Sequence, residues 1–300
     1  MKPSPEISFV VVNYNGIIHT RELLKSMEDN LKSLSYEVIV VDNGSLSDEG
    51  VLLSKEFPHY NIIRSEKNLG FSGGNNLGIK ASAGRYIMMI NNDTLLIDDS
   101  VKELVAMLES DTNIGAVSPK IHFLNPSGII QFAGYTKLTK ITLRNRAVGY
   151  NEYDSGQYDT PSETYSIHGA AMMINRDVLS TIGFMPEIYF LYYEELDWSS
   201  KMREYGYKLM YQPSALVIHK ESQSTGNDSY LKRYYMTRNR LLFASRNRKG
   251  IVRLLSISFQ LFVSVPKSFL CSIINGRRDL ALSTIKGTAA FFGLNNKDAN

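Results

Sequence analysis

Residues 7–16 read ISFVVVNYNG, an almost continuous apolar run that ends in a polar turn. A strand that is apolar on both faces has to be covered on both faces, as in the middle of a parallel sheet. The runs VIVV at 38–41 and IMMI at 87–90 repeat this pattern, and residues 61–64 carry a weaker version of it. These four segments predict neighbouring strands of one buried sheet.

Helical patterns separate these strands. Residues 20–31, between the first two strands, place their apolar side chains at helical spacing. After the IMMI run, residues 100–103 form a capping-box pattern in front of another amphipathic stretch. Because consecutive parallel strands need crossover connections, the sequence predicts an α/β fold, with a mostly parallel sheet flanked by helices.

The remainder of the chain is less regular. Residues 122–165 contain several Gly and Pro residues and little periodicity, which favours a loop-rich insertion or a small antiparallel excursion. Regular patterns return after this segment. They predict strands at 168–174, 209–211 and 215–219 and helices at 176–182, 194–205 and 229–247, with further helix to about residue 292.

The distribution of charge divides the chain in two. Its 300 residues include 33 Lys and Arg against 30 Asp and Glu, a formal net charge of +3. Residues 1–228 hold 20 basic and 28 acidic residues, whereas residues 229–278 hold 11 basic residues and no acidic one. We therefore expect an acidic α/β body over 1–228, with halves at about 6–120 and 121–228, and a basic, amphipathic helical extension over 229–300.

Composition excludes several classes of protein. A hydrophobic content of 43% and a charged content of 21% exclude a wholly disordered chain. The single cysteine, Cys271, excludes an intrachain disulfide and favours a reducing compartment. Residues 1–6 are short and polar, so we expect no signal peptide. Residues 251–270 are apolar, but charged and polar residues and a proline interrupt them, which argues against a spanning helix.

Polar clusters follow the predicted strands at the points where each strand ends. They are residues 13–16, 42–45 and 91–93, with His219 at the end of a later strand. Each cluster alone is explained by ordinary turn formation. Three in succession point to a ligand site, because ligands of open α/β sheets bind beyond the carboxyl ends of the strands.

Two of these clusters suit a nucleotide and a metal ion. Asp42 can accept hydrogen bonds from a ribose diol or from the N–H of a pyrimidine base. Asp93, beside two asparagines, offers the oxygen ligands that Mg²⁺ or Mn²⁺ binds, and His219 could add a nitrogen or be an ordinary polar residue. The dinucleotide fingerprint and the P-loop motif are both absent, which argues against a Rossmann dehydrogenase or a P-loop enzyme.

Two further segments carry unusual chemistry. Residues 68–78 are rich in Gly and Asn and predict a loop that leads into a helix, where free amides would bind phosphate or where the segment would be a simple linker. Residues 190–198 place three carboxylates among aromatic residues. On a helix Glu194 and Asp197 share a face and Glu195 points elsewhere. The acids either stabilise the helix N-terminus or include a general base whose pKa burial raises.

The order of these motifs resembles glycosyltransferase family 2, whose members have the GT-A fold, over about residues 6–250. The resemblance rests on VVNYNG, VIVVDNGSLSD, NLGFSGGNNLGI and NND in the first half of the chain. HGAAMMINRDVLSTIGFMPE and FLYYEELDWSSKMREYGYKL carry it in the second half. It implies that the first half binds a nucleotide-sugar donor and that the second half binds the acceptor.

The resemblance also implies a role for individual residues. Glu195 corresponds to the catalytic base, and Asp93 and His219 to metal ligands. Asn91 replaces the first Asp of the family's D-x-D element, and Glu195 replaces the Asp of its Glu-Asp pair. An Arg238-Asn239 pair is also shared, but its role does not follow from the sequence. The donor side then comprises Asn13, Tyr14, Asn15, Asp42, Asn43, Gly70, Asn76, Asn91, Asn92 and Asp93, and the acceptor side His168, Gly169, Glu194, Asp197 and Trp198.

The implied activity is an inverting sugar transfer with Mg²⁺ or Mn²⁺ as cofactor. The donor would be dTDP-rhamnose or a UDP-sugar, and the acceptor a hydroxyl of a glycan or of a lipid-linked sugar in O-antigen, capsule or cell-wall synthesis. The alternatives are a nucleotidyltransferase, and a catalytically inactive sugar-nucleotide-binding or membrane scaffold protein. A nucleotidyltransferase would need a basic Gly-rich loop after the first strand, which this chain lacks.

The basic segment 229–278 has three interpretations. Its Lys and Arg residues could contact the phosphates of a nucleic acid. They alternate with apolar residues, however, which favours an anionic membrane surface over a nucleic acid. A solvated helix packed on the catalytic body is the third interpretation. We expect a cytoplasmic protein at the inner face of the cell membrane, held peripherally by this segment.

Overall fold

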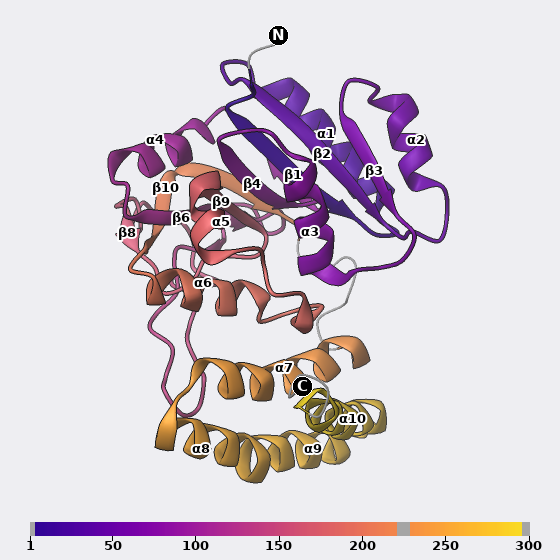
Figure 1. The fold of residues 1–300 in the computed structure, drawn as a ribbon, viewed down its shortest axis with the longest axis vertical. Helices are drawn as coiled ribbons and strands as arrows, with labels where there is room; N and C mark the ends of the chain where they lie inside the picture. Colours follow the sequence, from indigo (N-terminus) through magenta and orange to yellow (C-terminus); the bar gives the residue numbers. More distant parts are fainter. Residues whose placement is uncertain (1–3, 221–228, 296–300) are drawn as a thin grey trace.

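One mixed sheet runs through the part of the chain that the computed structural model describes, residues 4–220 and 229–295 (Figure 1). Its strand order is β3-β2-β1-β4-β9-β6-β10-β5. The first four strands in this order are parallel to one another and coincide with the four predicted segments, which confirms that prediction. They are β1 (Ile7–Asn13), β2 (Tyr36–Asn43), β3 (Asn61–Ser65) and β4 (Tyr86–Asn91).

The other half of the sheet is mostly antiparallel. β9 (Ala171–Asn175) pairs antiparallel with β4 and with β6 (Ile114–Phe123). β10 (Lys208–His219) runs parallel to β6, and β5 (Thr94–Leu96) closes this edge. The sequence does not predict β6, because Ser118, Pro119 and Lys120 interrupt its apolar run, although every one of its residues is buried. β10 is one strand with an irregularity between Gln212 and Leu216, where two separate strands were expected.

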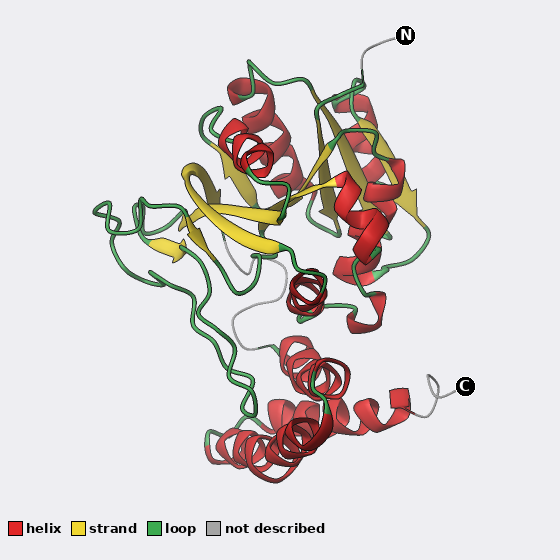
Figure 2. Cartoon of the chain, turned by 60° about the vertical axis from the view of Figure 1, so that its left-hand side comes forward, coloured by secondary structure: helices red, strands yellow, loops and turns green. Residues whose placement is uncertain are grey.

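The irregular segment 122–165 forms the expected antiparallel excursion. β7 (Ile130–Phe132) pairs with β6, and the short β8 (Ser162–Glu163) pairs with β10. Between these strands, residues 135–147 form a hairpin closed by a Tyr135–Ala147 bridge. Figure 2 shows the long loops of this segment descending from the sheet to the C-terminal helices.

Helices cover both faces of the sheet. They are α1 (Ile17–Asn30), α2 (Glu49–Glu56), α3 (Gly70–Ala81), α4 (Lys102–Ser110), α5 (Arg176–Ile182), the 3-10 turn η1 (Glu187–Tyr189) and α6 (Glu194–Glu204). The predicted capping box before α4 does not form. The Ser100 hydroxyl accepts instead from the backbone N–H of Leu216 at 3.1 Å, which ties α4 to β10.

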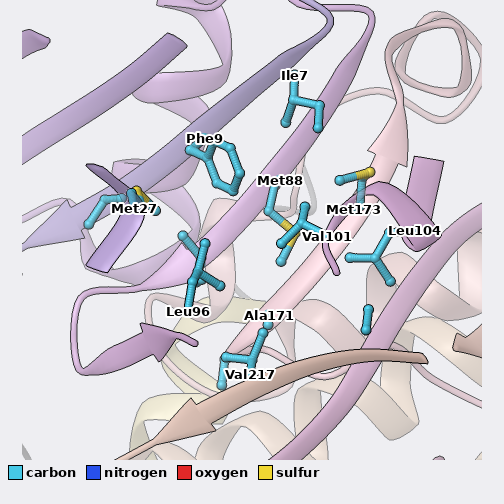
Figure 3. Close-up of a cluster of buried hydrophobic side chains, with 14 of the residues drawn as sticks. Ile7, Phe9, Met27, Met88, Leu96, Val101, Leu104, Ala171, Met173 and Val217 are labelled. Atoms are coloured by element: carbon cyan, nitrogen blue, oxygen red, sulfur yellow. The ribbon is translucent and has the colours of Figure 1, made fainter. Parts of the chain in front are cut away.

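The register of the strands aligns the core. Phe9, Met88 and Met173 lie side by side on β1, β4 and β9, facing Val101 and Leu104 on one face of the sheet (Figure 3). Since side chains alternate along a strand, the neighbouring residues point to the other face. There they pack against α3, α5 and α6. This second cluster includes Val10, Met89, Met172, Ile79, Val178 and Trp198.

The glycine-rich segment is a helix and not the predicted loop. α3 begins at Gly70, and two of its glycines, Gly74 and Gly78, face β1. A Cβ atom on Gly78 would lie 2.4 Å from the Val10 side chain, and one on Gly74 would lie 2.9 Å from that of Val12. The glycines therefore allow the helix to approach the sheet more closely than larger residues would.

The C-terminal segment forms a second helical layer, seen below the sheet in Figure 1. It contains α7 (Tyr230–Asn247), α8 (Gly250–Phe259), the π-helical turn η2 (Gln260–Ser264), α9 (Val265–Ile274) and α10 (Arg278–Asn295). α7 packs against the start of α6, where Leu241 and Phe243 join Tyr189 and Tyr193 in one buried cluster.

The run from Gly250 to Ile274 is continuous, because Pro266 falls in the first turn of α9, directly after the π-helical turn. Within the described residues it is the one helix that is long and apolar enough to cross a bilayer, and 11% of its apolar window is buried. The interruptions that argued against such a helix in the sequence do not break it. Length and composition of this kind also occur in helices that do not span a membrane.

Candidate functional site

The predicted polar clusters meet at one edge of the sheet. Asn13, the last residue of β1, lies opposite Asp42 on β2, and Asn91, the last residue of β4, lies opposite Val12. The polar turns after three adjacent parallel strands are thereby brought together, as the strand order requires.

The buried side chains of Asn13 and Asp42 support this edge through hydrogen bonds. The Asn13 amide donates to Glu49 Oε2 at 2.8 Å, and its carbonyl accepts from the Thr20 hydroxyl at 2.7 Å. Asp42 Oδ1 accepts from the Ser45 N–H of the following turn at 3.2 Å, and Oδ2 accepts from the Gly50 N–H in the first turn of α2 at 3.1 Å. Both side chains are fully buried, so their direct partners are protein groups. The sequence did not identify Glu49 as a member of this network.

The exposed part of the edge is formed by Tyr14 and Asn15. Tyr14 is 40% exposed, and Asn15 has a left-handed backbone conformation, with φ of 51°. The side-chain oxygen Oδ1 of Asn15 accepts from the Leu46 N–H at 2.8 Å, which joins the turns after β1 and β2. These two residues therefore form an exposed surface at the edge, and the buried residues beneath them hold it in place.

The first amides of α3 are already hydrogen-bonded. The N–H of Leu69 donates to Asn43 Oδ1, that of Gly70 to Asn68 Oδ1, and that of Phe71 to the Phe190 carbonyl at 2.7 Å. The predicted phosphate contact through free amides of this segment is therefore corrected, because these amides bind protein oxygens.

Asn76 has a similar internal role. Its amide donates to the Met185 carbonyl at 2.8 Å and to Glu187 Oε1 at 2.9 Å, and its oxygen accepts from Met185 N–H. Because the side chain is buried with both ends engaged, it joins α3 to the segment before η1. We reassign Asn76 from donor contact to positioning of that segment.

Asn92 and Asp93 of the third polar cluster, residues 91–93, have different roles. Asn92 donates to the carbonyl of Gly16 and to the Thr20 hydroxyl, so it supports the turn after β1. Asp93 instead points toward His219, with 3.1 Å between Asp93 Oδ1 and His219 Nε2. Burial acts to raise the pKa of Asp93, but the hydrogen bond and charge of His219 outweigh it, so the pKa lies below its ordinary value.

The chemistry of this pair fits a divalent cation. His219 Nδ1 lies 2.8 Å from Gln131 Oε1, which suits a proton on Nδ1. A metal ion would take the place of the proton between His219 Nε2 and Asp93 Oδ1. One carboxylate oxygen and one imidazole nitrogen 3.1 Å apart can occupy adjacent positions around one ion. The described residues contain no group of three His, Cys, Asp or Glu side chains able to hold a metal. A bound nucleotide would therefore have to supply further ligands.

A strained segment precedes the predicted base. Phe190, Tyr192 and Tyr193 have φ values of 65°, 68° and 78°, in the left-handed region that non-glycine residues rarely adopt. Each such residue costs on the order of 1–3 kcal/mol and persists only where its surroundings impose it. Residues 188–193 are called the strained segment below.

Arg238 and Asn239 hold the strained segment in this conformation. The Asn239 amide nitrogen lies 2.7–3.0 Å from the carbonyl oxygens of Tyr189, Leu191 and Tyr192. Arg238 Nη2 donates to the carbonyls of Ile188 and Tyr189. On the opposite side Gly70 packs so closely that a Cβ atom there would lie 2.2 Å from the Phe190 oxygen. The structure thus explains the Arg-Asn pair whose role the sequence left open.

The strained segment leads directly into α6 and sets the positions of its acids. Glu195 is half-buried and lines a cavity, and burial raises its pKa above the ordinary value. Glu194 is buried, and burial together with the charge of Glu195 raises its pKa well above the ordinary value. The expected separation of the two faces is therefore present in the structure.

Two residues expected on the acceptor side have structural partners. Asp197 is buried and forms an ion pair with Arg246 at 2.9 Å. Trp198 is 1% exposed, and its indole N–H donates to the Gly183 carbonyl at 3.0 Å. Neither side chain reaches the cavity, so we reassign both to holding α6 in place.

His168 and Tyr135 connect the two parts of the site. Their rings are stacked, with centroids 5.9 Å apart, and Gly169 leaves room beside Phe71. Burial and then the charge of His219 lower the pKa of His168 to about 3, so it is neutral at physiological pH. Its Nδ1 accepts from the Ala170 N–H, which places the ring proton on Nε2. Tyr135 lies beside Glu195 in the wall of the same cavity.

The cavity beside Glu195 has a volume of about 420 Å³. Its walls are the hairpin 135–147, the start of α6 and the first turns of α7. Such a cavity can hold a molecule whose hydroxyl faces the carboxylate.

Comparison with known proteins places this geometry in a family. The family model described as "Glycosyl transferase family 2" matches residues 8–183. A hexosyltransferase of low-salt glycan biosynthesis, Agl10 from Haloferax volcanii, is 29% identical over 242 residues, covering 79% of this chain and 75% of that protein. The N-acetylglucosaminyl-diphospho-decaprenol L-rhamnosyltransferase of Mycobacterium tuberculosis is 25% identical over 244 residues, covering 73% and 77%.

A solved structure shares the fold. GalNAc-T7 with UDP, GalNAc and Mn²⁺ superimposes with a TM-score of 0.61 at 14% identity, covering 88% of this chain and 57% of that one. At this level of identity the similarity concerns the fold alone.

Asn239→Ala is expected to lower the free energy of unfolding by about 1–3 kcal/mol, because buried carbonyl groups of the strained segment lose their donor. Urea denaturation measures this change. Hydrogen exchange at the amides of residues 189–193 should become faster in the same variant. Asn247→Ala is the control, since Asn247 lies on the same helix and its buried amide nitrogen has no hydrogen-bond partner. Equal losses of stability in the two variants would refute the role assigned to Asn239.

Asp93→Asn is expected to abolish Mn²⁺ binding in the presence of UDP, because the carboxylate ligand is lost. Gln131→Leu should weaken binding roughly 10–100-fold, since His219 loses the partner that orients it. Electron paramagnetic resonance of free Mn²⁺ measures both affinities. The control is Asp98→Asn, an exposed aspartate on the same stretch of chain. Unchanged affinity in Asp93→Asn would show that the ion binds elsewhere.

Proposed function

The chain belongs to glycosyl transferase family 2, and on this basis we propose that it is an inverting enzyme that uses a nucleotide-sugar donor. Its general class is a glycosyltransferase of glycan or polysaccharide synthesis, as in its relatives. The finer proposal is that dTDP-rhamnose or a UDP-sugar is the donor. The acceptor is then a hydroxyl group of a glycan or of a lipid-linked sugar.

The donor half of the site supports nucleotide binding at the sheet edge. Tyr14 and Asn15 offer an exposed surface for the nucleoside, and Asn91 leads into the turn that carries Asp93. Asp93 and His219 would hold Mg²⁺ or Mn²⁺ together with the diphosphate oxygens, and the GT-A relative binds Mn²⁺ with UDP. When bound, the ion would neutralise negative charge on the departing nucleotide.

The placement of Glu195 carries the proposal. Its carboxylate faces a cavity large enough for a sugar, and its raised pKa suits a group that accepts a proton from a hydroxyl. Glu195 would accept the proton as the hydroxyl oxygen attacks the anomeric carbon of the donor sugar. The bond from that carbon to the nucleotide breaks on the opposite face, so one displacement inverts the configuration.

The proteins similar to this chain support a lipid-linked acceptor. The mycobacterial relative bears the name of an enzyme that acts on a diphospho-decaprenol-linked sugar, and Agl10 that of a hexosyltransferase of glycan biosynthesis. Both names fit the synthesis of a surface polysaccharide, such as O-antigen or cell-wall glycan. We extend that role to this chain, with a rhamnosyl or other hexosyl residue as the transferred group.

The C-terminal helices support a peripheral position on the membrane. One face of the run Gly250–Ile274 is bonded to the rest of the protein, where Ser256 and Gln260 donate to the Ile141 carbonyl. A helix that is anchored along one side and apolar on the other suits the membrane surface better than a span. The residues exposed on this run include Ile251, Leu254, Leu255, Phe262, Val263, Leu270, Ile273 and Ile274.

This orientation is consistent with the charge of the segment. Arg253 and Lys267 are exposed on the run Gly250–Ile274 and would face anionic lipids, which contribute about 1 kcal/mol for each Lys or Arg near the surface. Arg238 and Arg246 of the same segment are instead bonded within the protein. We therefore propose that the enzyme works at the inner, cytoplasmic face of the cell membrane.

The enzyme should release nucleotide from one member of a panel of sugar nucleotides with Mn²⁺ or Mg²⁺ and a glycan or lipid-linked acceptor. Glu195→Gln is expected to lower kcat by roughly 10²–10⁴, because the general base is lost. The wild-type rate should rise with pH through the raised pKa of Glu195, since only the ionised form accepts a proton. The midpoint of the acid side of the pH–rate profile should therefore lie above the ordinary pKa of a glutamate, about 4.3.

Glu204→Gln is a matched control, because Glu204 lies on the same helix in an exposed ion pair with Lys249. It should leave both kcat and the acid side of the pH–rate profile unchanged. A near-native kcat in Glu195→Gln would show that Glu195 is not the general base. Absence of turnover and of binding with every donor would overturn the transferase proposal and favour a scaffold protein.

The full chain should sediment with vesicles that contain phosphatidylglycerol at low salt. The double variant Phe262→Asp/Ile274→Asp should remain largely in the supernatant, because its parent side chains are 78% and 81% exposed on the proposed membrane face. Leu46→Asp is the control, since Leu46 is 90% exposed but lies beside the donor site. A wild-type chain that stays in the supernatant would contradict membrane binding.

A further inference from the structure

The cavity beside Glu195 is unusually rich in cations. Lys232 and Arg240 of α7 and Arg144 of the hairpin 135–147 all line it. Glu195 is the single acid among the described residues of its wall. In the described part of the chain none of these three cations forms an ion pair with a carboxylate. Three cations that line one cavity without forming an ion pair with a carboxylate attract an anionic ligand.

The cationic surface continues toward the membrane-facing helices. A second cavity of about 220 Å³ shares Lys232 and Arg240 with the first and also borders Ser264 and Ser268 of the run Gly250–Ile274. Arg240 is held in place, because its guanidinium donates to the Tyr193 hydroxyl at 2.8 Å. A fixed guanidinium is well suited to phosphate oxygens, which it can bind with two hydrogen bonds.

The same cavity also has an apolar wall. Leu138 and Leu143 of the hairpin, Leu196 of α6 and Met236 of α7 line it together with the cations. A free phosphate or a soluble sugar would leave this wall without a partner. A phosphate ester of an apolar alcohol would contact both the cations and the apolar side chains.

We propose that this cavity binds the diphosphate of a lipid-linked acceptor and the first part of its hydrocarbon chain. Lys232, Arg240 and Arg144 contact the phosphate oxygens, and the hydrocarbon extends over Met236 toward the exposed apolar face of the run Gly250–Ile274. The attached sugar then lies beside Glu195. This assignment rests on the proposed function and deepens it by naming the chemistry of the acceptor.

Farnesyl diphosphate is the probe for this site, titrated into the full chain by calorimetry in the presence of EDTA, so that no metal-bound diphosphate contributes. The double variant Lys232→Gln/Arg144→Gln should bind it about 100-fold more weakly, at about tenfold for each cation removed. The charge-matched control is Lys249→Gln/Arg253→Gln, which removes two cations of the same segment outside the cavity walls. The control should bind like the wild type.

Two further ligands separate the contributions of the phosphate and the hydrocarbon. Inorganic pyrophosphate should bind more weakly than farnesyl diphosphate, and farnesol should not compete with it. Both double variants lose two positive charges, so both should bind to phosphatidylglycerol vesicles equally well. Equal affinity of the cavity variant and the control variant for farnesyl diphosphate would overturn the proposal. A cavity variant that keeps its affinity for farnesyl diphosphate but no longer binds vesicles would also overturn it.

The test is independent of transfer. Glu195→Gln should bind farnesyl diphosphate at least as tightly as the wild type, because the variant removes the one carboxylate of the cavity wall and no cation. Failure of every sugar nucleotide in the donor panel would overturn the proposed function without changing this binding result. Loss of selective binding with transfer intact would overturn the cavity assignment alone.

Discussion

The strained segment 188–193 is the constraint on which the proposed catalytic side of the molecule depends. Three of its residues have left-handed backbones, and the cost is offset by Asn239 and Arg238 on one side and by the first turn of α3 on the other. Helix α3 beside the donor edge of the sheet, helix α6 with its acids, and helix α7 of the C-terminal layer therefore all meet at this short segment. The direction in which Glu195 points follows from contacts made by residues distant in the sequence.

Much of the fold follows from the sequence, because buried parallel strands have a pattern that is hard to mistake. The strands of the parallel half appear where their apolar runs predict them. β6 escapes prediction because its polar residues are accommodated inside the sheet, where Lys120 pairs with Asp154 and His122 also contacts Asp154. The glycines of α3 indicate a loop by composition alone. Only their packing against Val10 and Val12 explains why they are part of a helix.

For the candidate site too, the sequence predicts which residues are involved better than it predicts what each one does. Spacing and family resemblance identify Asp93, His219 and Glu195, but not what surrounds them. Asn13, Asn76 and Trp198 are polar or aromatic residues in motif segments, yet each is buried against protein groups. Gln131 and Glu49 lie in segments without a recognisable motif. Their roles depend on which residues the fold places beside them, and one sequence contains no direct signal of that.

The location of α7 has a consequence for the way the chain can be divided. The charge pattern suggests a boundary near residue 228, yet α7 forms a wall of the cavity and supplies the pair that holds the strained segment. A chain that ended there would expose the side chains that pack against Leu241 and Phe243, and the Tyr192 carbonyl would lose its hydrogen bond from Asn239. The C-terminal helical layer is thus not an appendage that can be added or removed. It is a structural part of the proposed catalytic site, so a change that removed the proposed membrane anchor would also disturb that site.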